Sequence, residues 1–107
     1  MSVRISALYP DGKDARFDFD FYCEHHLPLV LRLFGEHGCT RVEADRGLPG
    51  ADGQAPTYIA VGHMEFDSVD GFKAAMAASG KRILADVPKY TNVTPVLQIG
   101  EIATSLS

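Results

Sequence analysis

An amphipathic helix is expected to begin within the stretch Phe17-Asp18-Phe19-Asp20-Phe21-Tyr22-Cys23-Glu24-His25-His26-Leu27-Pro28-Leu29-Val30. Tyr22 and His26 are four residues apart, so on a helix they share one face, and Val30 continues that face. A phenol and an imidazole are therefore expected to point toward the core. This placement makes Tyr22 and His26 the leading candidates for a functional site.

Pro28 lies inside this helix, which is predicted to run to about His37. Proline has no amide hydrogen, and its ring crowds the carbonyl four residues earlier, here that of Glu24. We therefore expect a kink or a break in the helix just before Pro28. His26 would then lie where the backbone hydrogen-bond ladder is imperfect, and such defects also occur at functional sites.

The rest of the chain predicts four strands and a second helix. The first strand is predicted at 3–9, where apolar and polar residues alternate. Three more strands are expected at 39–47, 57–66 and 92–101, and a helix is expected at 69–85. Strict alternation would put Cys39 on the same wet face as Arg41. The order β-α-β-β-α-β predicts an α+β fold of the ferredoxin-like type, with a four-stranded antiparallel sheet and two helices on one face.

The composition fits one domain over residues 1–107. Hydrophobic residues make up 46% and charged residues 22% of the chain, which is ordinary for a globular protein. A chain of 107 residues can hold a core without metal or disulfide staples. Cys23 and Cys39 are expected to be buried free thiols.

The charge pattern excludes two classes of partner. The net charge is -4 and no run of Lys or Arg occurs, so nucleic acid and anionic membrane surfaces are poor partners. No apolar run approaches the ~20 residues that span a bilayer. Residues 1–9 lack the order of regions found in a signal peptide. We therefore expect a cytoplasmic protein without nucleic-acid or membrane partners.

If the sheet face away from the helices is apolar, it must be buried against another surface. Apolar residues at alternating strand positions are Val3, Ile5, Ile59, Val61, Leu97 and Ile99. The strand register decides which of them face away from the helices. Packing two sheets face to face would bury such a surface, so we expect a homodimer through the sheet face. The alternative is a monomer with a mixed outer face.

Four segments together resemble a known family. They are residues 17–30, Gly62-His63-Met64-Glu65-Phe66-Asp67-Ser68, Ala85-Asp86-Val87-Pro88-Lys89-Tyr90-Thr91-Asn92 and Pro95-Val96-Leu97-Gln98-Ile99. In this order the chain resembles the EthD family of the dimeric α+β barrel superfamily, named after ethyl tert-butyl ether degradation. The resemblance places the family histidine on His26 and the family tyrosine on Tyr22. Related proteins include cofactor-independent monooxygenases, an isomerase, polyketide cyclases and haem-binding enzymes, so the fold does not fix the chemistry.

The two leading residues each have a functional and a structural interpretation. His26 could exchange a proton near neutral pH, as general acid–base catalysis requires, or be a core histidine bonded to a backbone carbonyl. Tyr22 could donate a hydrogen bond to an enolate or phenolate oxygen, or be a core aromatic residue. His25 lies about 100° around the helix from His26 and is expected to face solvent.

Three further residues are candidates for substrate binding. His63 shares a pocket with His26 if its strand face meets the helices, and otherwise lies inside the dimer barrel. Asp86 and Tyr90 flank Pro88 after the second helix, where they could line the pocket mouth or simply end the helix. No residues show metal-ligand spacing and no glycine-rich phosphate loop precedes a helix, so we expect neither metal nor cofactor.

Two functions remain open at this point. The first is a cofactor-independent enzyme of xenobiotic or secondary catabolism, in which His26 moves a proton on a small apolar or aromatic molecule and Tyr22 orients it. The second is a non-catalytic binding or accessory protein in an ether-degradation type of pathway. An enzyme needs at least two polar groups aimed at one atom position, whereas a carrier needs only shape and apolar area. A structural dimer without a ligand is the third possibility.

Overall fold

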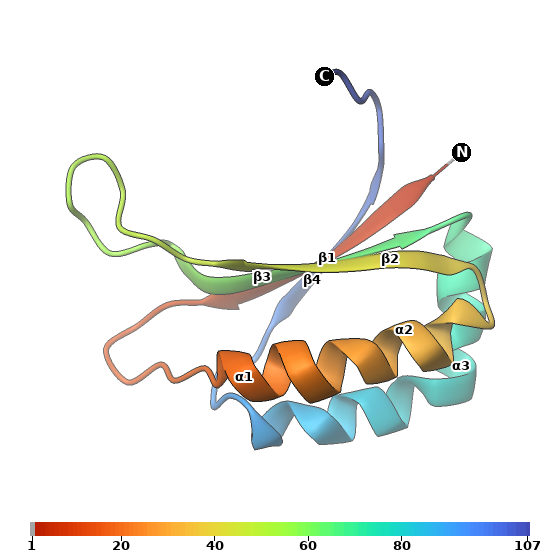
Figure 1. The fold of residues 1–107 in the computed structure, drawn as a ribbon, viewed down its shortest axis with the longest axis horizontal. Coiled ribbons are helices and arrows are strands. Elements are labelled where there is room, and N and C mark those ends of the chain that lie inside the picture. Colours follow the sequence, from red (N-terminus) through yellow and green to blue (C-terminus); the bar gives the residue numbers. More distant parts are fainter. Residues whose placement is uncertain (1) are drawn as a thin grey trace.

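The structure, a computed structural model, describes residues 2–107 and has two layers (Figure 1). The first layer is an antiparallel sheet in the order β2-β3-β1-β4. Its strands are β1 (Val3–Pro10), β2 (Cys39–Arg46), β3 (Tyr58–Phe66) and β4 (Val96–Glu101). The predicted β-α-β-β-α-β order is confirmed, and the strand predicted at 57–66 occupies a central position.

The second layer consists of helices that all lie on one side of the sheet (Figure 1). It contains α1 (Phe19–Phe21), η1 (Tyr22–His26), α2 (Leu27–Gly35), α3 (Val69–Asp86) and η2 (Val87–Lys89). The first three follow one another without a break, because the residues at their junctions all have right-handed helical backbone angles. No helix within residues 2–107 is both long and apolar enough to cross a membrane.

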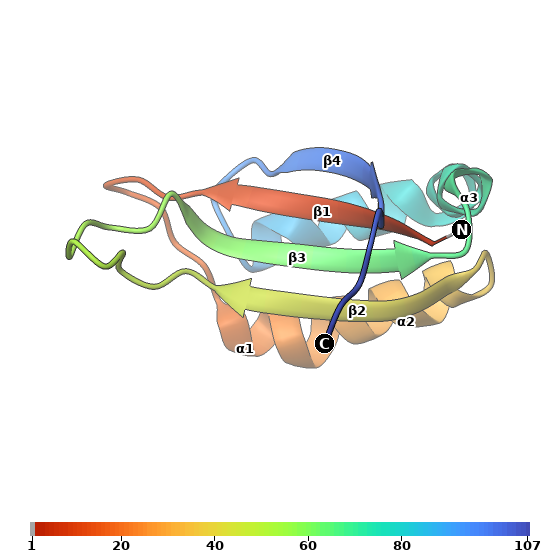
Figure 2. The same ribbon diagram turned by 90° about the horizontal axis from the view of Figure 1, so that it is seen from above.

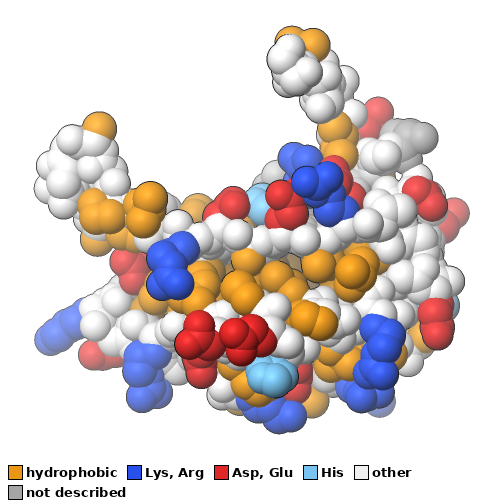
Figure 3. Space-filling view, in the orientation of Figure 1, with side chains coloured by type: hydrophobic (Ala, Val, Ile, Leu, Met, Phe, Trp, Pro, Cys, Tyr) orange, Lys and Arg blue, Asp and Glu red, His pale blue; other side chains and the backbone are white. Residues whose placement is uncertain are grey.

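The core lies between the two layers. The inward face of β1 buries Val3, Ile5, Ala7 and Tyr9, as the alternation predicts. Figure 3 shows hydrophobic side chains gathered in the seam between the sheet and the helices, with charged side chains around them. A β-bulge between Cys39 and Arg41 adds one residue to β2. The bulge turns Cys39 into the core while Arg41 stays exposed, so strict alternation is wrong for Cys39.

The last strand begins later than predicted because the preceding segment has another partner. The Thr91 hydroxyl donates to the Arg16 carbonyl at 2.6 Å, and the side-chain amide of Asn92 donates to the Asp14 carbonyl at 2.9 Å. Residues 91 and 92 are therefore bound to the segment that leads into α1, and β4 starts only at Val96. These bonds hold the end of α3 beside the start of α1.

The register settles which residues lie on the outer face of the sheet, the face away from the helices. Leu97 and Ile99 pair with Ala7 and Ile5 and therefore face the helices. Val61 pairs with Leu8 on the opposite face. The middle of the outer face is polar, and Leu8, Val61 and Val96 form an apolar area near one end. Residues 102–107 leave the sheet on its outer side, as Figures 1 and 2 together show.

Candidate functional site

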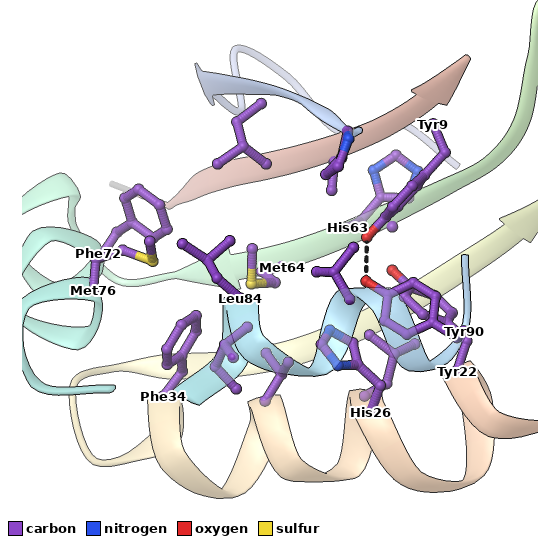
Figure 4. Close-up of a pocket in the computed structure, with 18 residues that line it drawn as sticks. Tyr9, Tyr22, His26, Phe34, His63, Met64, Phe72, Met76, Leu84 and Tyr90 are labelled. Atoms are coloured by element: carbon purple, nitrogen blue, oxygen red, sulfur yellow. Dashed lines mark hydrogen bonds between the residues drawn. The ribbon is translucent and has the colours of Figure 1, made fainter. Parts of the chain in front are cut away.

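A cavity of about 60 Å³ lies between the helices and the sheet. Its walls are aromatic and aliphatic side chains, with only a few polar atoms among them. Figure 4 shows Phe34, Phe72 and Met76 at one end. The opposite end gathers Tyr9, Tyr22, His26 and Tyr90. The polar atoms therefore converge at one end of an otherwise apolar cavity.

The helix irregularity predicted before Pro28 takes the form of a π-helical turn. In η1 the Leu27 amide donates to the Tyr22 carbonyl, five residues earlier, instead of the usual four. Pro28 follows directly at the start of α2, where its missing amide is tolerated. Tyr22 and His26 form the two ends of this turn, and both are buried. Short π-helical turns inside α-helices are often found at functional sites.

His26 is enclosed by aromatic rings and one carboxylate. His26 is only 4% exposed. Its ring stacks on that of Tyr22, with a centroid distance of 5.4 Å and an interplanar angle of 18°. The Tyr90 ring lies 4.7 Å away. Nδ1 is 3.3 Å from Oδ2 of Asp86, so the partner is a carboxylate and not a backbone carbonyl. Burial lowers the pKa of His26, although Asp86 opposes this shift.

Asp86 is the last residue of α3 and joins the buried histidine to the surface. One carboxylate oxygen faces His26, and the other accepts from Lys89 Nζ at 3.0 Å. Burial by itself raises the pKa of Asp86, but the hydrogen bonds from Lys89 and His26 outweigh it and lower the pKa. Asp86 is therefore ionised. Of the two alternatives drawn from the sequence, the pocket mouth and the end of the helix, the structure shows Asp86 at the end of the helix, behind His26 and outside the cavity wall.

Three tyrosines bring hydroxyl groups to the same end of the cavity. The Tyr9 and Tyr90 hydroxyls lie 2.6 Å apart, and the Tyr22 ring lies 4.9 Å from the Tyr90 ring (Figure 4). Burial raises the pKa of all three phenols, so they are neutral hydrogen-bond donors at physiological pH. A Cβ at Gly62 would collide with the Tyr22 hydroxyl, which explains the glycine at this strand position.

Of the residues predicted for the site, Tyr22, His26 and Tyr90 meet at the cavity. Sequence reasoning missed Tyr9, which it treated only as an inward strand residue. Its inward hydroxyl was the available signal, but the partner Tyr90 lies 81 residues away and cannot be paired with it from spacing alone.

His63 lies on β3 and is one of the residues that line the cavity, but its side chain points to the outer face of the sheet. Its Nδ1 is 3.2 Å from the Ser6 hydroxyl, and its Nε2 is 2.9 Å from Asp45 Oδ2. The His63 side chain therefore lies on the sheet face away from the helices and does not face His26. His25 is exposed and its ring lies 5.2 Å from that of Phe21, as expected for the solvent side of the helix. Among residues 2–107, no three His, Cys, Asp or Glu side chains are close enough to hold a metal ion.

The two-layer fold with a cavity between helices and sheet defines an α+β ferredoxin-like protein. The chain belongs to the EthD family, because the EthD domain model matches residues 10–94. It is also similar to the crystal structure of an EthD-like protein from Ralstonia eutropha JMP134. That protein is 36% identical with a TM-score of 0.92, and the match covers 99% of this chain and 96% of the other.

More distant structures share the fold. SnoaB, described as a cofactor-independent oxygenase from Streptomyces nogalater, is 14% identical with a TM-score of 0.65, over 98% of this chain and 96% of the other. A protein from Thermobifida fusca, described as a dimeric ferredoxin-like protein of unknown function, is 19% identical with a TM-score of 0.59, over 92% and 89% of the two chains. None of the curated proteins compared with the chain matches it.

Proposed function

We propose that this protein is a cofactor-independent enzyme that moves a proton on a small apolar or aromatic molecule bound in the cavity. The observation that carries the proposal is the neutral, buried imidazole of His26 at the same cavity end as three neutral phenols. An apolar cavity with a few convergent polar groups is the usual form of a small-molecule site. The description of SnoaB as a cofactor-independent oxygenase is consistent with it at the level of the fold.

His26 is suited to act as the base. Its Nδ1 faces an ionised carboxylate, so Nδ1 carries the hydrogen and donates it to Asp86. The lone pair on Nε2 then remains to accept a proton from a C–H or O–H group of the substrate. Asp86 stabilises the imidazolium that forms, and Lys89 keeps Asp86 ionised. Asp86 is thus a positioning residue that acts through His26.

The tyrosines are suited to stabilise the charge left on the substrate. When the proton moves to His26, its electron pair stays on the substrate as an enolate or phenolate. Neutral Tyr22 can donate a hydrogen bond to that oxygen, and Tyr90 can do so when Tyr9 is the donor in the Tyr9–Tyr90 hydrogen bond. Such donors matter most where water is excluded. Isomerisation, cyclisation and oxygenation by O2 can proceed from this anion, and decarboxylation produces the same kind of anion when CO2 leaves.

A binding or accessory protein is the second candidate. It is favoured by one observation, the predominance of aromatic and aliphatic side chains in the cavity wall. Such a wall holds an apolar catabolic intermediate through shape and buried area without any chemistry. In that case the His26–Asp86 pair would only stabilise the fold.

Proton exchange separates the two candidates. A panel of aryl ketones, phenols and lactones is incubated with the protein in D2O, and deuterium incorporation is followed by NMR. We expect exchange with at least one class, and its loss in His26→Gln. His25→Gln is the matched control, because His25 is adjacent but exposed, and it should keep full exchange. Ligand binding without any exchange would refute the enzyme and support the accessory protein.

We also propose that the protein forms a homodimer through the outer face of the sheet. The helices leave this face open, and Leu8, Val61 and Val96 give it an apolar area. The Thermobifida fusca protein with the same fold is described as dimeric. Cys23 and Cys39 are free thiols, which is consistent with a reducing, cytoplasmic location, although Cys23 is exposed and not buried as expected from the sequence.

A further inference from the structure

A second concave region lies between the two long helical segments, separate from the cavity. This groove has a volume of about 630 Å³. The residues lining it are Phe21, Glu24, His25, Pro28, Leu29, Arg32, Arg82, Ala85, Asp86 and Lys89. They come from the α1–η1–α2 run on one side and from the end of α3 and η2 on the other, which lie side by side in Figure 1. We call this region the basic groove.

The basic groove is positively charged in an acidic protein. It contains the cations Arg32, Arg82 and Lys89 against the carboxylates Glu24 and Asp86, whereas the whole chain has a net charge of -4. In the part of the chain that the structure describes, neither arginine takes part in an ion pair. Two guanidinium groups, one from each helix, are therefore available to a ligand.

One wall of the groove is aromatic. The rings of Phe21 and His25 lie 5.2 Å apart at an angle of 41° beside the cationic groups. Guanidinium groups bind carboxylates through paired hydrogen bonds, and ring faces pack well against a flat aromatic ligand. The groove thus offers both charge and an apolar surface to one small molecule.

We propose that the basic groove binds a small aromatic carboxylate, held by Arg32 and Arg82. Lys89 and Asp86 both line the groove, and Lys89 Nζ, on a side chain that is 63% exposed, lies 3.0 Å from the Asp86 carboxylate. A bound carboxylate competes with Asp86 for Lys89. Asp86 then keeps His26 as its main partner, so binding in the groove changes the electrostatic environment of the histidine in the cavity.

Binding in the groove does not require any chemistry in the cavity, because the two arginines proposed to hold the ligand do not line the cavity. Binding can therefore be measured without a substrate and without activity. If no proton transfer is detected but the carboxylate binds, only the proposed function is refuted. If binding fails while exchange succeeds, only the groove proposal falls.

The test is an NMR titration of ¹⁵N-labelled protein with benzoate, acetate and inorganic phosphate at constant ionic strength. We expect saturable shifts with benzoate at the backbone amides of Arg82, Ala85 and Lys89, accompanied by a shift of the His26 ring. Arg82→Gln and Arg32→Gln should each weaken benzoate about tenfold, the loss expected for one charge-assisted hydrogen bond. Lys81→Gln removes a neighbouring exposed charge outside the groove and should leave the affinity unchanged.

Several outcomes would overturn the proposal. Non-saturable shifts with all three anions, or equal weakening by Lys81→Gln, would show only diffuse attraction to positive charge. Saturation with phosphate but not with benzoate would rule out the carboxylate. Shifts centred on Gly62 and Met64 instead would show that benzoate enters the cavity.

Discussion

The pairing of His26 with Tyr22 is the part of the site that local sequence specifies. Residues four apart share a helix face, and the structure brings their rings together even though the turn between them is π-helical. Asp86 and Tyr9 are different, because each acts through a residue far away in the chain. Their roles depend on tertiary packing, which spacing along one element cannot supply.

The lowered pKa of His26 predicts a specific pH dependence of stability. In the unfolded chain the histidine titrates near 6.5, and in the folded protein burial keeps it neutral to lower pH. Between these two values the unfolded state binds the extra proton, so the free energy of unfolding falls as the pH drops below about 6.5. Above 6.5 the histidine contributes no slope.

Urea unfolding from neutral pH down to about pH 5 measures this slope. His26→Gln should show a smaller loss of stability over this range than the unchanged protein. His25→Gln should retain the full loss, since His25 is exposed. Equal slopes in all three proteins would contradict a lowered pKa for His26.

At the level of elements, sequence patterns located the helices and strands well but not all their ends. The helix predicted at 69–85 is observed as Val69–Asp86, with Ser68 as its cap. The strand predicted from residue 92 begins at Val96 because residues 91 and 92 bond to the segment before α1. The bulge at Cys39 could not be predicted from the sequence pattern for a similar reason, because it depends on how β2 pairs with β3.

Both helical segments begin with a side-chain cap, but only the cap of the segment that carries His26 lies next to the site. The Asp18 carboxylate accepts from the Phe21 amide at 3.0 Å, and the Ser68 hydroxyl accepts from the Gly71 amide at 3.0 Å. Replacing either cap with alanine should cost ~1 kcal/mol in the free energy of unfolding. Only Asp18→Ala loosens the turn next to Tyr22, so it should also slow proton exchange.

Chemical denaturation and the D2O exchange assay of Asp18→Ala and Ser68→Ala compare the two effects. The two variants should lose similar stability, with full exchange kept by Ser68→Ala. If both variants lose exchange equally, the capped turn has no special connection to the site and the loss reflects stability alone.

For the whole molecule, the order of elements was enough to predict the two-layer architecture. It was not enough to describe the outer face, because only the register shows which apolar residues point outward. Val3, Ile5, Leu97 and Ile99 turn toward the helices, so the outer face is more polar than the strand sequences suggest. The apolar contribution to a sheet-mediated dimer is therefore concentrated near Val61.

The proposed dimer can be broken by one charge in this apolar area. Val96 lies there on the edge strand and is 56% exposed, so Val96→Asp should leave the subunit folded. Burying the new carboxylate in the interface should weaken dimerisation by roughly 2 kcal/mol or more. Sedimentation velocity should show a dimer for the unchanged protein and a monomer for Val96→Asp at the same concentration.

The control is Leu48→Asp, because Leu48 is exposed in the loop between β2 and β3 and lies off the sheet face. It should remain dimeric. A monomer for the unchanged protein at micromolar concentration would refute the sheet-mediated dimer.

The two ends of the chain have a practical bearing on these experiments. The Ile102 amide donates to the Ser2 carbonyl, and the residues after it rise from the outer side of the sheet (Figure 1). An affinity tag fused to the carboxyl terminus would therefore project from the surface proposed to hold the second subunit. Tags on recombinant protein should therefore be removed by a protease before sedimentation. Otherwise a tag that blocks dimerisation would make the protein sediment as a monomer.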